Sequence, residues 1–192
     1  LFPAFAVDTA QLTSDLSALL RQRITSQLED DGYAADLVQA VAGDTVSTTR
    51  LLRDPLDVRV RIQLLRGLRD QGRLTAVQAV VQRASRLAEK GDLPLDVLSS
   101  TEVVDPSRFE SASEKGLFDA TKRLTPLAER GSYQELCDVL VESTPALEAF
   151  FDGDQSVMVM ADDPALRMNR LNLLGVLRNQ AAVFAQFELI QS

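Results

Sequence analysis

The sequence contains no histidine, no tryptophan and a single cysteine, Cys137, among its 192 residues. Without histidine, the chain lacks the commonest general base and metal ligand, and it cannot form a Ser-His or Cys-His nucleophilic pair. One cysteine excludes an intramolecular disulfide and a thiolate zinc site, and it suits a reducing compartment. We therefore expect no catalytic centre, no metal site and no cofactor in this chain, and a cytoplasmic location.

Long apolar runs and phosphate-binding loops are also missing. No apolar stretch approaches the roughly 18 residues of a membrane span, and no charged-then-apolar leader is present, so we expect neither export nor insertion in a membrane. The glycines near Gly67 and Gly72 are not followed by Lys-Ser/Thr, so we do not expect ATP binding by this chain. It begins with Leu1-Phe2-Pro3 and not with Met, from which we expect a piece of a longer protein.

Basic residues are concentrated in one part of an acidic chain. The formal net charge is -8, from 20 Lys+Arg and 28 Asp+Glu. Residues 50–90 nevertheless hold ten basic and four acidic side chains, and nine of the ten are arginine. Arginine pairs with phosphate and stacks on bases, so this segment is a candidate for RNA binding. The alternative is that these arginines pair with acidic side chains of the two flanking segments.

Helical periodicity from end to end predicts an all-α bundle, with no internal repeat. The first predicted helix carries an apolar stripe and stops at Gly32, and its stripe consists of Leu12, Leu16, Leu19, Leu20, Ile24 and Leu28. A short helix ending at Gly43 follows, and then two arginine-bearing helices, one after Pro55 and one capped by Thr75. We interpret residues 157–160 as a buried connection, because no partner strand is available.

Several dipeptides predict where helices begin, because an oxygen-bearing side chain can cap a helix whose first residue is proline. These dipeptides are Asp54-Pro55, Asp105-Pro106, Thr144-Pro145 and Asp163-Pro164. Ser132 and Glu135 have the spacing of a capping box, which predicts another helix start.

The acidic loops near the end of the chain allow two interpretations. One interpretation is a divalent-metal site formed by Asp152, Asp154, Asp162 and Asp163. We favour the other, in which carboxylates before a helix cap its first N–H groups and interact with the helix dipole. Cys137 lies between apolar neighbours in a predicted helix, and we interpret it as structural.

Three arginines are candidates for specific roles. Arg170 falls nearly in phase with Leu166 and Leu173, so we expect its side chain in a buried ion pair. Arg83 and Arg86 are one helical turn apart and flank an apolar stripe, which places them better for a ligand.

The end of the sequence resembles the C-terminal region of bacterial glycyl-tRNA synthetase beta subunits. The resemblance rests on Phe150-Phe151-Asp152 and on the run from Val157 to Leu174. Within that run, Asp163-Pro164-Ala165-Leu166-Arg167 is similar, with one residue inserted, to the sequence for which the DALR anticodon-binding domain is named. Weaker similarities at residues 54–57, 82–87, 109–110 and 114–117 extend the resemblance over nearly the whole chain.

The resemblance implies an all-α fold with two parts: a leading helical segment over residues 1–72, packed on a DALR-like anticodon-binding helical bundle over residues 73–192. It also implies that this chain holds no catalytic residue. The RNA-binding residues expected from the resemblance and from the charge pattern are Gln82, Arg83, Arg86, Arg167, Asn169 and Arg170.

The function implied is recognition of the tRNA(Gly) anticodon within glycine–tRNA ligase. Glycylation would take place on a separate alpha subunit, where the holoenzyme uses ATP and Mg. The expected partners are tRNA(Gly), the remainder of the beta subunit and the alpha subunit, with no DNA and no membrane. The alternative is a non-catalytic helical scaffold for protein interaction, whose arginines dock an acidic face of a partner.

Overall fold

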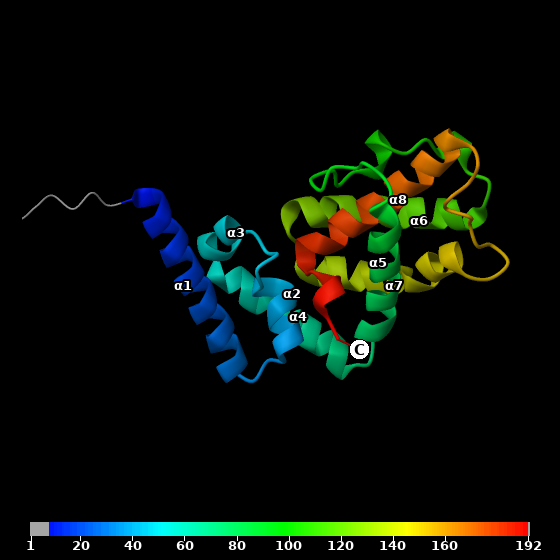
Figure 1. The fold of residues 1–192 in the computed structure, drawn as a ribbon. Coiled ribbons are helices and arrows are strands. Elements are labelled where there is room, and N and C mark those ends of the chain that lie inside the picture. Colours follow the sequence, from blue (N-terminus) through cyan, green and yellow to red (C-terminus); the bar gives the residue numbers. More distant parts are fainter. Residues whose placement is uncertain (1–7, 192) are drawn as a thin grey trace, which may run out of the picture.

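The structure is a computed structural model that describes residues 8–191, so the opening Leu1-Phe2-Pro3 lies outside the described residues. Within them the chain forms eight α-helices, three short 3-10 helices and no strand, which confirms the all-α prediction (Figure 1). None of the described helices is apolar over a length sufficient to cross a membrane. The α-helices are α1 (Thr9–Asp30), α2 (Ala35–Ala42), α3 (Thr48–Arg53), α4 (Pro55–Asp70), α5 (Leu74–Ala88), α6 (Ala112–Arg130), α7 (Tyr133–Phe151) and α8 (Pro164–Phe184), and the 3-10 helices are η1 (Ser100–Glu102), η2 (Pro106–Arg108) and η3 (Phe187–Leu189).

The helices form two groups around one core. Helices α1 to α4 lie at one end of the molecule and α5 to α8 at the other (Figure 1). In the second group α6 packs along α7, and α8 packs against both α5 and α6. One continuous cluster of buried side chains takes members from both groups, among them Leu37 and Leu65 from the first and Val81, Leu124 and Phe184 from the second. The boundary at residue 72 stays a prediction.

The segment after α8 joins the two groups. The backbone N–H of Gln186 donates to the carbonyl oxygen of Ala40 in α2 at 2.9 Å. Gln78, buried in α5, donates from Nε2 to the carbonyl oxygen of Ile190 at 2.5 Å. The N–H of Gln191 donates to Asp36 Oδ2 at 2.8 Å. Polar groups from α2 and α5 therefore fix the end of the chain between the two groups of helices.

Three of the four predicted Xaa-Pro helix starts are confirmed. The side chains of Asp54, Asp105 and Asp163 each accept a hydrogen bond from the backbone N–H two residues later, at 2.8 to 3.0 Å. The start at Thr144-Pro145 is wrong, because α7 continues through Pro145 to Phe151. The apolar stripe of α7 is buried on both sides of this proline, and the proline ring is exposed, so packing keeps the helix continuous.

Other helix boundaries also differ from the sequence prediction. Thr75 does not cap α5, because the helix already includes Leu74 and follows Arg73. The short helix α3 was not predicted. Residues 157–160 form a connection, as expected, in which Val159 is buried and Met158 is exposed.

Two helical glycines provide a matched test of the packing. A Cβ at Gly175 in α8 would lie 2.8 Å from Leu93 Cδ2 and 3.2 Å from Leu93 Cβ, whereas a Cβ at Gly67 in α4 would meet no atom within 4 Å. Gly67→Ala should raise the free energy of unfolding by about 0.5–1 kcal/mol through helix propensity. Gly175→Ala should lower it by about 1 kcal/mol or more, because overpacking costs more than propensity gains.

Urea denaturation of the two variants measures this difference. A stabilisation of similar size at both positions would show that α8 does not approach Leu93 closely.

Candidate nucleic-acid interface

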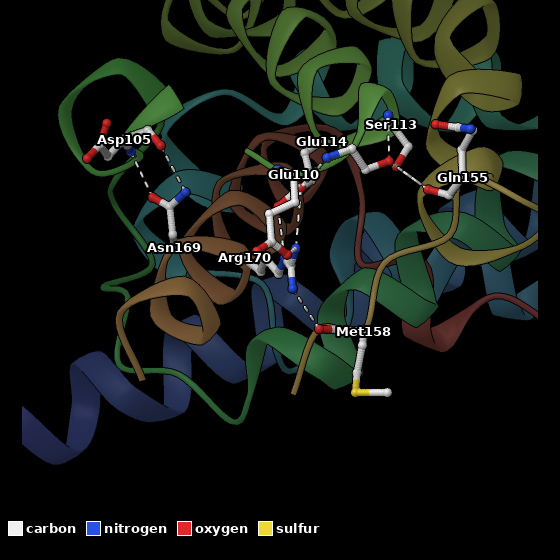
Figure 2. A network of polar contacts seen from close by, with 9 residues as sticks. Asp105, Glu110, Ser113, Glu114, Gln155, Met158, Asn169 and Arg170 are labelled. Carbon is white, nitrogen blue, oxygen red and sulfur yellow. Dashed lines mark hydrogen bonds and ion pairs between the residues drawn. The ribbon is translucent and has the colours of Figure 1, made fainter. Parts of the chain in front are cut away.

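Arg170 lies at the centre of a buried network near the start of α8 (Figure 2). Its Nε donates to Glu114 Oε1 at 2.8 Å, one Nη donates to Glu110 Oε2 at 2.9 Å, and the other donates to the carbonyl oxygen of Met158 at 3.1 Å. Arg170 is 5% exposed and Glu114 is fully buried, which confirms the expected buried ion pair. Desolvation acts to lower the pKa of Arg170, but hydrogen bonds and charge from Glu114 and Glu110 outweigh it and raise that pKa.

Glu114 also begins α6. Its Oε2 accepts hydrogen bonds from the backbone N–H groups of Glu110 and Ser111 at 2.8 and 2.9 Å, and the Ser111 hydroxyl oxygen accepts from the N–H of Ser113, which completes a capping box. One carboxylate thus caps α6 and neutralises Arg170 of α8. Sequence reasoning missed Glu114, although its spacing from Ser111 was the available signal.

The helix start predicted at Ser132 is confirmed, because Ser132 is the N-cap residue of α7, but the hydrogen bonds of a capping box do not form there. Ser132 precedes α7, but its side chain caps no backbone N–H. Its hydroxyl oxygen accepts instead from Arg130 Nε at 2.7 Å, and Glu135 accepts from Arg130 Nη2 at the same distance. The nearby arginine outcompetes the backbone for both acceptors, and the sequence spacing alone does not reveal this competition.

Asn169 and Arg167 also contact the chain itself. Asn169 accepts from the N–H of Asp105 at 2.7 Å and donates to the carbonyl oxygen of Asp105 at 3.1 Å, so it holds the loop before η2 against α8 (Figure 2). Arg167 donates to the carbonyl oxygen of Ala161 at 2.9 Å. RNA contacts by Arg167, Asn169 and Arg170 stay predictions. The polar groups of these three side chains already form hydrogen bonds within the protein.

The residues predicted on α5 are arranged differently. Gln82 is half-buried and donates to the carbonyl oxygen of Phe187 at 2.9 Å, which helps to fix η3. Arg83 is exposed, its guanidinium lies 4.7 Å from the centroid of the Phe151 ring, and it pairs with Asp152 at 2.6 Å. The side chain of Arg86 is exposed and forms no hydrogen bond or ion pair with any residue in the range 8–191. Arg83 and Arg86 are therefore accessible from solvent on one face of α5.

Most of the arginine-rich segment is paired internally. Three of its ion pairs reach the flanking acidic segments, and they confirm the pairing alternative for these residues: Arg59–Asp31, Arg69–Asp36 and Arg83–Asp152. Hydrogen bonds from Arg69 outweigh the opposing effect of burial and hold the pKa of Asp36 below its usual range. Three further arginines pair within the segment itself, namely Arg50, Arg61 and Arg66.

The most buried of these arginines joins the two groups of helices. Arg61 is 1% exposed; its Nε donates to Asp57 at 2.8 Å and its Nη1 donates to the carbonyl oxygen of Phe184 at 3.2 Å. Arg50 donates to the carbonyl oxygen of Val183 at 2.6 Å. Burial, followed by the charge of Arg50, lowers the pKa of Arg61. These two arginines donate hydrogen bonds to carbonyl groups at the C-terminal end of α8, because this helix has no basic residue in its own last turn to do so.

Asp163 of the acidic loops caps a helix, and Cys137 is buried. Asp163 accepts from the N–H of Ala165 at 2.8 Å, as the capping interpretation expects. Among residues 8–191 no cluster of three or more Cys, Asp or Glu side chains is arranged to hold a metal ion. Burial raises the pKa of the Cys137 thiol to about 12, so the thiol stays protonated at neutral pH.

The fold and its internal ion pairs define the class: an all-α bundle whose helices are joined by buried arginines. The beta subunit of glycine–tRNA ligase from Picosynechococcus sp. is 46% identical over an alignment of 187 residues that covers 93% of this chain and 26% of that protein. The Acaryochloris marina beta subunit is 42% identical over an alignment of 196 residues that covers 97% of this chain and 28% of that protein. No protein-family model matches the chain.

The chain belongs to the glycine–tRNA ligase beta subunit family, as the sequence resemblance predicted. It spans about a quarter of the length of the curated relatives that it matches. A more distant relative, the beta subunit of Actinobacillus pleuropneumoniae, is 29% identical over 182 residues, 95% of this chain and 25% of that protein.

The buried ion pair of Arg170 generates a stability prediction. Arg170→Met should lower the free energy of unfolding by about 3–5 kcal/mol, because the Glu114 carboxylate stays buried without its partner. Arg123→Met should lower it by about 1 kcal/mol or less, because the 2.7 Å pair between Arg123 and Glu142 is exposed. Urea denaturation measures both changes.

A second variant separates the buried charge from lost packing. Arg170→Met combined with Glu114→Gln removes the uncompensated charge and keeps an acceptor for the capping box, so part of the lost stability should return. Equal losses in the single and the double variant would contradict the assigned cause.

Proposed function

We propose that this chain is the part of a glycine–tRNA ligase beta subunit that recognises the anticodon of tRNA(Gly). Its membership of the beta subunit family carries the proposal. The chain would act in the cytoplasm as a tRNA-binding component. Glycine activation with ATP and Mg would take place on the alpha subunit, and this chain would supply no catalytic group.

The accessible cations of α5 support a binding surface for RNA. Arg83, Arg86 and Lys90 follow one another at intervals of three and four residues, and all three are exposed. This spacing places them along one side of the helix and of its C-terminal end. A row of cations about one helical turn apart can contact successive phosphates of an unpaired strand.

The surroundings of Arg83 favour stacking. Its guanidinium lies over the ring of Phe151, so the aromatic ring orients the guanidinium plane. Both side chains of the ion pair between Arg83 and Asp152 are exposed, and such pairs contribute little to stability. A phosphate can therefore replace the carboxylate as the partner of Arg83. Arginine planes and aromatic rings are typical partners of the unstacked bases of an anticodon loop.

A labelled anticodon stem-loop of tRNA(Gly) tests the function. Fluorescence anisotropy should show binding to this chain that weakens when the anticodon cytosines are replaced. Each specific base contact is worth about 1–3 kcal/mol, so one replacement should weaken binding by about fivefold or more. Binding that ignores the anticodon sequence, or no binding, would favour the protein-interaction scaffold.

The double substitution Arg83→Ala, Arg86→Ala tests the surface. It should weaken binding of the stem-loop by about tenfold or more, because two charge-assisted contacts are lost. It should also flatten the slope of log affinity against log salt concentration by about 1.4 units, which is about 0.7 for each phosphate contact to a single strand.

Arg123→Ala together with Arg130→Ala provides the matched control. These arginines are as exposed as Arg83 and also pair with carboxylates, but they lie on α6. The control should leave affinity and salt slope unchanged. If both double variants weakened binding equally, a general loss of positive charge would explain the effect and α5 would lose its assignment.

A further inference from the structure

Helix α1 carries an apolar face that no described part of the chain covers. Leu12, Leu16, Leu19 and Leu20 are each between 48% and 52% exposed. They follow the three- and four-residue spacing of a core-facing stripe, and the sequence predicted an ordinary amphipathic helix from them. In the structure Leu28 is the only residue of α1 that is buried. The helix lies at one edge of the molecule (Figure 1).

Polar contacts hold α1 in place. Arg21 donates to the carbonyl oxygens of Ala42 and Val46 at 3.0 and 2.7 Å and to Thr48 Oγ1 at 2.6 Å. This arginine clamps one side of α1 to the ends of α2 and α3. The leucines are displaced from Arg21 around the helix, so the clamp orients their face away from the core. The orientation of the leucine face is thus fixed by named contacts.

The apolar surface continues from α1 towards α4. Between these helices lies a hollow of about 340 Å³. Its apolar lining is Leu20, Ile24, Leu28, Pro55 and Val58, and Arg23, Gln27 and Arg59 complete its rim. Two residues that neighbour this lining on α4, Leu56 and Val60, are 70% and 47% exposed. Exposed leucines that are aligned on one helix face beside an apolar hollow mark an interaction site, whereas the exposed leucines of an ordinary surface are scattered singly.

The character of this surface favours a protein over RNA. Between Thr9 and Leu20 the only charged residue is Asp15. An RNA surface would need a row of cations along the leucines. The cations of this surface, Arg23 and Arg59, lie at the hollow, and Arg59 is paired with Asp31 at 2.7 Å. An apolar face with few charges is typical of permanent interfaces, which resemble the core of a domain.

The lengths of the relatives indicate the occupant. About three quarters of each curated beta subunit lies outside the region that matches this chain. A segment of the same polypeptide is present at high effective concentration, so it covers an apolar face more readily than a second copy does. We propose that the leucine face of α1, with the adjoining hollow at α4, is the surface on which another part of a full-length beta subunit packs.

Thiol labelling at one leucine tests this docking. Leu16→Cys is placed in this chain alone and in a full-length beta subunit in which this chain replaces the matching quarter of the Picosynechococcus protein. A maleimide should react with this thiol at least tenfold more slowly in the full-length subunit. Gln22→Cys, exposed on α1 outside the stripe, should react at the same rate in both. Peptide mass spectrometry measures each site, and the buried Cys137 reports whether the fold is intact.

Three labelling results would overturn the proposal. Equal rates at Leu16→Cys in the short and the full-length chains would show that the face stays open. Protection in the short chain that grows with its concentration would assign the face to a second copy. Protection in the short chain at every concentration would assign the face to residues 1–7.

A second variant does not depend on the hybrid subunit. Leu16→Gln combined with Leu19→Gln should leave the melting temperature of the short chain unchanged, because glutamine and leucine have similar helix propensities and the face is open there. The same pair should lower the melting temperature of the full-length hybrid. A marked fall in the short chain would show that its own residues already cover the leucines, which contradicts the proposal.

Discussion

A buried guanidinium group must have a carboxylate or carbonyl partner, and this constraint organises both ends of α8. Near the first turn Arg170 reaches Glu114, and near the last turn buried Arg61 and half-buried Arg50 reach the carbonyl oxygens of residues 184 and 183. Because leaving Arg170 or Arg61 unpaired in a dry interior is costly, the partner helices can take only positions that satisfy them. Helix α8 is therefore joined to α6 at one end and to α3 and α4 at the other.

This constraint also limits which cations can serve a polyanionic partner. The sequence concentrates arginine in residues 50–90, but the structure uses Arg61 entirely in the interior and ties Arg69 to Asp36. Positive charge is left accessible along α5, at Arg83 and Arg86, where the neighbouring acids are few and exposed. Under the proposed function, the acidic surroundings of the chain would restrict an RNA to this face, because like charges would repel it elsewhere.

Sequence reasoning succeeded where one local rule decided the outcome. Asp54, Asp105 and Asp163 cap helices because their partners are two residues away, and the phase of Arg170 with the leucines of α8 indicated its burial. It failed where two parts of the chain compete for one group. Pro145 stays inside α7 because α7 is packed on both sides of it, and Arg130 takes the acceptors of Ser132 and Glu135 that a capping box would have used.

The sequence by itself determined the helical character, most helix ends and the family, because these depend on residue order and on short-range spacing. The tertiary structure alone decided which arginines form ion pairs or hydrogen bonds inside the protein, which carboxylate neutralises Arg170, and which apolar stripe remains uncovered. Those outcomes join residues more than 50 positions apart, such as Glu114 with Arg170 or Arg50 with Val183. Periodicity predicts that a residue faces inward, but only the arrangement of the helices shows whether another side chain or backbone group contacts it there.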